Sequence, residues 1–145
     1  MRVLSLFVSL LLCSCNHRRP DGLQVINLPQ PDYPVEAREQ NVQGSVEVNV
    51  FIGTDGKVIA AVGKGTQPTL VHAAEQNARS WIFGPFNTVT QFPINHTIMY
   101  RYELCDHCKF MISDSPIIRT YLPDSLDIIS QPLASGYPAA GKENR

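Results

Sequence analysis

The fold is decided by residues 44–62, which read GSVEVNVFIGTDGKVIAAV. The first nine of these residues place an apolar side chain at every second position, at Val46, Val48, Val50 and Ile52. A period of two is typical of a β-strand with one buried face. The pair Asp55-Gly56 separates this run from a second apolar run at 58–62, and Asp-Gly between apolar runs favours a hairpin turn. The stretch therefore predicts two antiparallel strands.

Segments with helical signals flank this hairpin. Pro34 suits the first position of a helix that runs to about Gln40. A second helix is predicted from Pro68 to a stop at Gly84-Pro85, because its core-facing residues recur at spacings of three and four. These residues are Leu70, Ala73, Ala74, Asn77, Ala78, Trp81 and Ile82, of which all but Asn77 are apolar. A long strand, Phe92 to Leu104, is predicted to follow, with alternate residues on one face.

The C-terminal part of the chain is less regular. Residues 105–130 are expected to be an extension, in which 116–121 and 125–130 are consistent with a second hairpin around Leu122-Pro123-Asp124. Residues 131–145 show no periodicity and are predicted to be a disordered tail. The 145 residues suffice for one compact domain, and the formal net charge of −1 argues against a nucleic-acid binder, which usually shows a basic face.

The N-terminus resembles the signal peptide of a bacterial lipoprotein. The apolar run Val3 to Leu12 follows Arg2 and spans about half of the roughly 20 residues that a bilayer-spanning helix needs. The next residues, Leu12-Cys13-Ser14-Cys15, resemble a lipobox, with Ser14 as the small residue before the acylated cysteine. We expect residues 1–14 to be removed and Cys15 to carry the lipid, which would place the chain on an envelope membrane, facing the periplasm. An ordinary cleaved signal or an uncleaved anchor is the alternative.

Residues 15–30 are then expected to be a tether. Within it, the apolar patch Leu23 to Leu28 is consistent with a strand at the edge of the domain.

Cys105-Asp106-His107-Cys108 is the one group with the spacing of a redox or metal site. A thioredoxin-type site places its first cysteine at a helix N-terminus, whereas this motif follows a predicted strand. A structural zinc site needs four ligands, and the motif offers three. We therefore expect a local disulfide between Cys105 and Cys108, which an oxidising compartment permits. The sequence predicts no catalytic residue, no metal site and no cofactor.

An ordered set of residues resembles the C-terminal domain of TonB, the energy transducer of Gram-negative envelopes. The set is Pro31-x-Tyr33-Pro34-x-x-Ala37, Gly44-x-Val46-x-Val48, Asp55-Gly56-x-Val58, Gly65, Leu70 to Ala78, and Trp81-x-Phe83-x-Pro85. It covers about residues 31–104. The resemblance implies an α+β fold, namely a small two-layer domain with a three-stranded antiparallel sheet and two helices on one face. Tyr33 and Trp81 would be core aromatics.

The resemblance also implies a way of binding. Domains of this family pair an exposed sheet edge with an extended segment of an outer-membrane transporter, so backbone hydrogen bonds supply affinity. The long strand would be that edge. The candidate partner-binding residues are Asn95, His96, Thr97, Ile98, Met99, Tyr100 and Arg101. This chain has a lipobox and a short tether where a transducer has a membrane helix and a Pro-rich spacer, so it is interpreted as a stand-alone module that binds an envelope protein.

Two alternatives stay open. The first is a structural or assembly role, in which the edge is covered by a second copy in a homodimer or by the chain's own apolar segment Ile117 to Ile129. The second, more distant, is a redox protein that depends on Cys105 and Cys108. A covered edge favours the first alternative, and dithiol reductase activity favours the second.

Overall fold

A computed structural model of the chain describes residues 23–84, 86, 91–106, 108 and 115–133. The predicted signal peptide, the acylation site Cys15 and residues 134–145 of the predicted tail lie outside these ranges. The elements in chain order are β1 (Val25–Asn27), α1 (Val35–Glu39), β2 (Gly44–Ile52), β3 (Val58–Lys64), α2 (Pro68–Ala78), β4 (Ile82–Phe83), β5 (Ile94–Leu104), β6 (Ile117–Tyr121) and β7 (Ser125–Ser130). No helix among the described residues is long and apolar enough to cross a membrane.

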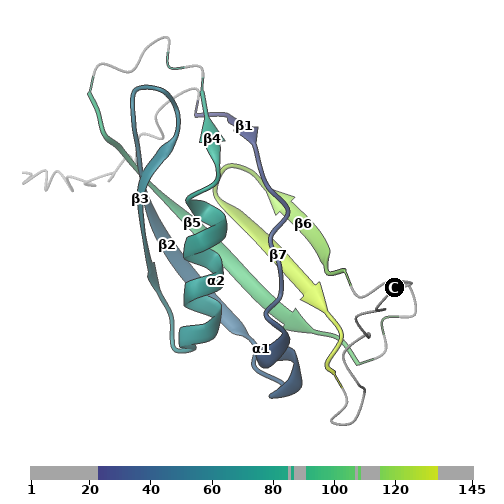
Figure 1. Ribbon diagram of the computed structural model, residues 1–145. Coiled ribbons are helices and arrows are strands. Elements are labelled where there is room, and N and C mark those ends of the chain that lie inside the picture. The colour runs from purple at the N-terminus through teal and green to yellow at the C-terminus, as the bar shows by residue number, and fades with distance from the viewer. Residues whose placement is uncertain (1–22, 85, 87–90, 107, 109–114, 134–145) are drawn as a thin grey trace, which may run out of the picture.

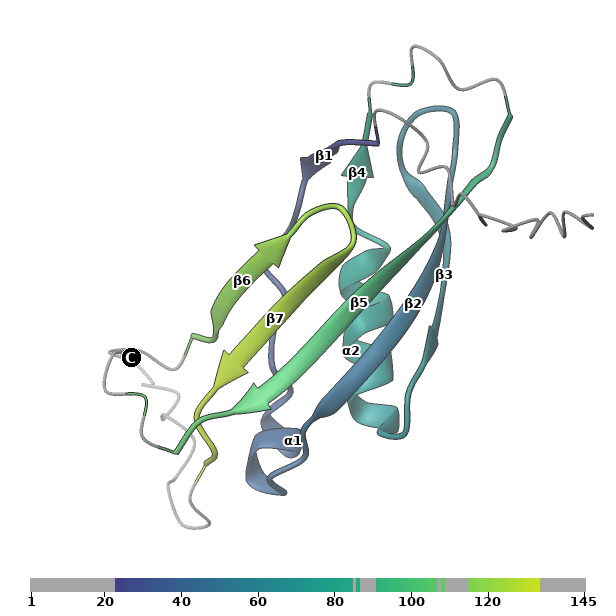
Figure 2. The ribbon, with the colours of Figure 1, turned by 180° about the vertical axis from the view of Figure 1, so that it is seen from behind.

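The domain has two layers, with both helices on the same face of a five-stranded sheet (Figure 1). Seen from behind, no helix lies on the other face of the sheet, which is called the open face below (Figure 2). The alternation predicted for β2 is confirmed, because Val46, Val48, Val50 and Ile52 are all buried. Helix α2 packs its buried residues Leu70, Ala74 and Ala78 into the same core. This is the α+β arrangement that the sequence predicts.

The sheet is larger than predicted and is mixed. Its strand order is β3-β2-β5-β7-β6. The strands β3, β2 and β5 are antiparallel as expected, but the sheet has two further strands, so the expected three-stranded, wholly antiparallel sheet is wrong. The second hairpin is present as β6 and β7, and β7 lies parallel to β5. This pairing sets Tyr100 beside Leu126 and Tyr102 beside Ile128. The hairpin joins the sheet because Leu126 and Ile128, each 0% exposed, complete the core.

The segment around Trp81 also differs from the prediction. Helix α2 ends at Ala78 instead of reaching Gly84, and the next residues form β4. The last turn tightens, since the N–H groups of Ser80 and Trp81 donate to carbonyls three residues back. Trp81 still faces the core from outside the helix, so the helical spacing of apolar residues continues beyond the helix itself.

Strand β4 forms a separate two-stranded sheet with β1. β1 lies within residues 15–30, the predicted tether, and it is the edge strand that the patch Leu23 to Leu28 suggests. The Asp55-Gly56 turn of the β2–β3 hairpin adjoins this small sheet, because the Phe83 N–H donates to the Gly56 carbonyl at 2.8 Å. Gly56 has φ +80°, and a Cβ at this position would clash with the Phe83 carbonyl, so the turn requires glycine.

Asn77 is the polar centre of the aromatic core. Its Oδ1 accepts hydrogen bonds from Trp81 Nε1 at 2.9 Å and from the Tyr100 hydroxyl at 3.0 Å. Its Nδ2 donates to the Pro29 carbonyl at 2.9 Å. Trp81 and Tyr100 are fully buried, and Asn77 is the partner shown for their polar atoms. The amide therefore joins α2, β5 and the segment that precedes α1.

Three buried tyrosines are expected to make the domain sensitive to alkali. Burial raises the pKa of Tyr33 to about 12, and it also raises the pKa of Tyr100 and of Tyr102. Unfolded tyrosines ionise near pH 10, so above about pH 10 the unfolded state loses protons that the folded state keeps. The stabilisation is complete below about pH 10, and we expect the free energy of unfolding to fall as the pH rises towards 12. Urea denaturation at several pH values measures this fall.

Tyrosinate absorbance provides an independent check of the same prediction. Because burial raises the pKa of Tyr33, Tyr100 and Tyr102, these three side chains should ionise together with unfolding. Ionisation of the three buried tyrosines near pH 10, with the domain still folded, would contradict the prediction.

Candidate functional site

The strand predicted to be the binding edge lies inside the sheet. β5 pairs with β2 on one side and with β7 on the other. The Met99 N–H donates to the Asp124 carbonyl, and the Cys105 N–H donates to the Ser130 carbonyl, each at 2.9 Å. The prediction that this strand forms the sheet edge is therefore wrong, because the β6–β7 hairpin occupies that side. A partner-binding role for its residues stays a prediction.

The candidate residues of β5 mostly have partners within the chain. Ile98 and Tyr100 are buried in the core, whereas Asn95 is exposed. His96 Nε2 lies 3.1 Å from the Pro123 carbonyl, and the Thr97 hydroxyl donates to Asn49 Oδ1 at 2.7 Å. The Met99 N–H donates to the Asp124 carbonyl, just before β7, as described above. Arg101 Nε donates to Asp127 Oδ1 at 2.6 Å. These contacts hold β5 in place within the sheet.

Strand β7 is too deeply buried to be displaced easily from its place beside β5. Its residues from Leu126 to Ser130 are all buried. Fully burying an aliphatic side chain contributes about 1.5–3 kcal/mol, and displacing β7 would lose this contribution at Leu126 and Ile128. A partner strand could not recover it without supplying equivalent side chains. The two end strands of the sheet, β3 and β6, are therefore the places to look for a binding edge.

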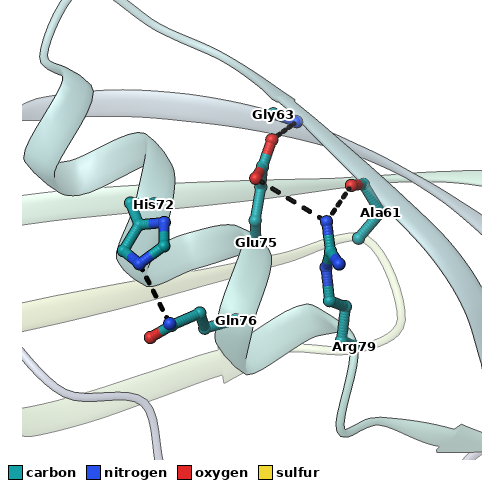
Figure 3. A network of polar contacts seen from close by, with 6 residues as sticks. All are labelled: Ala61, Gly63, His72, Glu75, Gln76 and Arg79. Carbon is teal, nitrogen blue, oxygen red and sulfur yellow. Dashed lines mark hydrogen bonds and ion pairs between the residues drawn. The ribbon is translucent and has the colours of Figure 1, made fainter.

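The outer edge of β3 is covered by two side chains, one from α2 and one from the residue that follows it (Figure 3). Glu75 Oε1 accepts a hydrogen bond from the Gly63 N–H at 2.7 Å, and Arg79 Nη2 donates to the Ala61 carbonyl at 3.2 Å. Glu75 and Arg79 also form an ion pair at 3.9 Å, as residues four apart on a helix can. Together these side chains occupy outward backbone groups that an added strand would need. Covering an edge in this way protects it from pairing with other chains.

The two remaining side chains in Figure 3 show that this arrangement is specific to one side of α2. Gln76 Nε2 lies 2.9 Å from His72 Nε2, and both side chains are exposed. Among the described residues, this second i, i+4 pair makes no hydrogen bond or ion pair with β3. Of these four side chains in Figure 3, Glu75 and Arg79 are the two that bond to the strand.

The other end strand, β6, directs Ile118 and Thr120 outward. The carbonyls of Asp124 and Ser130 accept hydrogen bonds from β5, so the even-numbered residues of β7 direct their backbone groups towards β5. The odd-numbered residues of β7 consequently direct theirs towards β6. The register pairs Arg119 with Asp127, and Arg119 therefore bonds inward. Its neighbours on β6 consequently direct their N–H and C=O groups away from the sheet. Among the described strands, none pairs with this outer side.

The side chains of β6 that share the open face are exposed. Ile117 is 36% exposed and Tyr121 is 53% exposed, with Arg119 between them. Leu122, in the turn that follows, is also exposed. β6 therefore combines unused backbone groups with accessible apolar side chains, which is the combination that strand addition requires.

The Cys105-x-x-Cys108 motif lies just beyond the end of β5. The structure joins the two residues by a disulfide, with Cα atoms 5.7 Å apart. The described residues include no group of three side chains suited to hold a metal ion. The disulfide closes a small loop in the connection from β5 to the β6–β7 hairpin.

The sequence did not predict the roles of Glu75, Arg79 and Asn77. Glu75 and Arg79 carried a signal, because opposite charges four residues apart mark a helix surface. Asn77 also carried one, as the single polar residue in the apolar stripe of α2. Neither signal says which strand or ring the side chain would meet.

Comparison with known proteins identifies the family. No curated protein matches the chain. The family described as Gram-negative bacterial TonB protein C-terminal matches residues 29–104. This match runs from just before α1 to the last residue of β5, and the β6–β7 hairpin lies beyond it. The matched segment is more than half of the 145 residues, so the chain belongs to the family of Gram-negative bacterial TonB protein C-terminal domains.

Proposed function

We propose that this chain is a lipid-anchored envelope protein that binds an extended segment of a partner protein by strand pairing at β6. Domains of this family mediate protein–protein interaction in the envelope. The observation that carries the choice of edge is the contrast between the two end strands. β3 is capped by Glu75 and Arg79, whereas β6 directs the backbone of Ile118 and Thr120 outward. The partner is an envelope protein, with an outer-membrane transporter as the leading candidate, and the role is not enzymatic.

Backbone pairing at β6 gives weak affinity by itself. Ile118 and Thr120 each offer one donor and one acceptor to an added strand. A hydrogen bond contributes a net of about 0.5–1.5 kcal/mol, so these groups alone support weak binding. A lipid anchor adds to this by confining the domain near other envelope proteins, which raises the effective concentration of the partner. Anchoring and strand pairing therefore support each other in the proposal.

Acylation at Cys15 is tested by Cys15→Ala. We expect this variant to lose the lipid and to leave the detergent fraction or accumulate as an unprocessed precursor. Intact mass measures both outcomes. Cys13→Ala is the matched control, because it also removes a cysteine of the signal region but should keep the lipid. A mature chain with an unmodified Cys15, or with cleavage elsewhere, would overturn the anchor.

Strand pairing at β6 is tested by Thr120→Pro. A proline at this position removes one outward N–H and leaves the bonds to β7 in place. A photoreactive residue at Tyr121, which is exposed, reports partner capture in cells. We expect Thr120→Pro to lower the yield of the crosslinked partner about two- to tenfold, the effect of one lost hydrogen bond.

Two further variants serve as controls for the effect of Thr120→Pro. Thr120→Val keeps the N–H and should preserve the crosslink. Arg119→Pro should instead destabilise the domain, because Arg119 bonds inward to β7. An unchanged crosslink in a folded Thr120→Pro protein would show that β6 does not capture the partner.

A structural or assembly role is the second candidate. The observation that favours it is the coverage of β5 by the chain's own β7. In that role β6 would pair with a second copy or remain unpaired. Sedimentation of the full chain in detergent distinguishes a homodimer from the monomer that a binding module predicts.

A further inference from the structure

A row of charged side chains crosses the open face of the sheet towards β6. The register places Arg101 of β5 beside Asp127 of β7, and Asp127 beside Arg119 of β6. Arg101 Nε lies 2.6 Å from Asp127 Oδ1, so this pair is already formed. No described side chain makes a hydrogen bond or ion pair with the guanidinium of Arg119. The row therefore ends at the sheet edge with Arg119, whose positive charge has no partner among the described side chains.

Apolar side chains flank this charge at two-residue spacing. Ile117 and Tyr121 lie on the same face of β6 as Arg119, because alternate residues of a strand share a face. Tyr121 also lies beneath Arg101, whose Cζ is 5.9 Å from the ring centroid. The outer edge of β6 thus presents an aliphatic group, a cation and an aromatic ring in sequence.

From this pattern we propose that the strand captured by β6 carries an acidic residue opposite Arg119, flanked two positions away on each side by apolar residues. The inference rests on the proposed function and specifies the partner segment. Since Ile118 and Thr120 supply the outward backbone bonds, an antiparallel partner residue opposite Arg119 lies in a non-hydrogen-bonded pair, where side chains approach most closely. Opposite charges and apolar pairs at such positions stabilise a sheet. The pattern is symmetric about its centre, so it suits either strand direction.

The same charge disfavours a second copy of the chain. The antiparallel register that pairs all of β6 with its own copy is centred on Arg119. It would set two guanidinium groups directly opposite each other, and like charges opposite each other are destabilising. The edge is therefore better matched to an acidic segment than to itself.

Two peptides that differ at one position test the inference. KTVTDTVTK has an acidic centre with valines two positions away, and KTVTKTVTK replaces that centre by lysine. Each is titrated into the full, isotope-labelled chain in detergent, and amide shifts of residues 117–121 report binding at β6. We expect the acidic peptide to bind about two- to fivefold more tightly, as one cross-strand charge pair allows. Arg119→Glu should reverse this order of affinity.

Lys64→Glu is the matched control. It makes the same change in net charge at β3, at the opposite end of the sheet, and should leave the order of the two peptides unchanged. If Lys64→Glu reverses the order as well, the preference reflects the overall charge and the inference fails.

The remaining outcomes separate the two proposals. Equal binding of both peptides at β6, abolished by Thr120→Pro, would overturn the acidic preference and support strand pairing. Shifts at β3, or no shifts at β6 together with an unchanged crosslink in Thr120→Pro, would overturn both proposals. No peptide shifts, but a crosslink that Thr120→Pro removes, would overturn only the partner pattern.

Discussion

Asn77→Leu is expected to lower the free energy of unfolding by about 3 kcal/mol or more. The substitution keeps a side chain of similar size but removes every hydrogen bond of the amide. It leaves Trp81 Nε1, the Tyr100 hydroxyl and the Pro29 carbonyl without the partner that Asn77 provides. Each buried polar group left unpaired costs about 1–3 kcal/mol. Urea denaturation of the variant and of the unmodified chain measures the difference.

Matched variants separate the loss of hydrogen bonds from the change of shape. Gln76→Leu makes the same replacement at the adjacent, exposed position of α2 and should change stability little. Tyr100→Phe removes a hydroxyl that donates to Asn77, and it should be destabilising. Tyr102→Phe removes a buried hydroxyl that has no partner among the described residues, and it should be neutral or stabilising. Equal effects of the two tyrosine variants would argue against the amide as the organising group.

Ile128→Ala is expected to lower the free energy of unfolding by about 2–5 kcal/mol. The side chain is fully buried beside Tyr102, and removing it leaves a cavity between β7 and the rest of the core. Denaturation midpoints measured in urea give the change. Ile117→Ala, in the same hairpin but on an exposed position of β6, should cost much less.

This comparison decides whether the hairpin is a fixed part of the domain. A small effect of Ile128→Ala, comparable to that of Ile117→Ala, would mean that β7 contributes little to the core. β5 would then again be a candidate edge for a partner, as the family resemblance implies. A large effect keeps β7 in place and directs attention to β6.

Local signals in the sequence predicted the local structure. The alternation from Val46 to Ile52, the Asp55-Gly56 turn and the runs on both sides of Leu122-Pro123-Asp124 each gave the correct strands, because period and turn chemistry are short-range properties. Trp81 misled the prediction, since its spacing from Ala78 and Ala74 suits a helix although the residue lies beyond the helix end.

The order of strands could not be obtained in the same way. Inserting β7 between β5 and β6 depends on contacts between Leu126, Ile128 and two tyrosines that lie about twenty-five residues earlier. No local pattern distinguishes this parallel pairing from a hairpin that stands apart from the sheet. The candidate site changed with it, because the edge of a sheet is a property of the whole strand order. The roles of Glu75 and Arg79 depend in turn on how α2 lies against β3.

The capped edge of β3 has a consequence for stoichiometry. A sheet with two open ends can grow head to tail, because the last strand of one molecule can pair with the first strand of the next, and such contacts do not close into a finite assembly. Glu75 and Arg79 block growth at one end by occupying the Gly63 N–H and the Ala61 carbonyl. The edge of β6 can therefore accept a strand, whereas Glu75 and Arg79 disfavour the addition of a strand at β3. This asymmetry opposes the growth of filaments through the domain's own sheet.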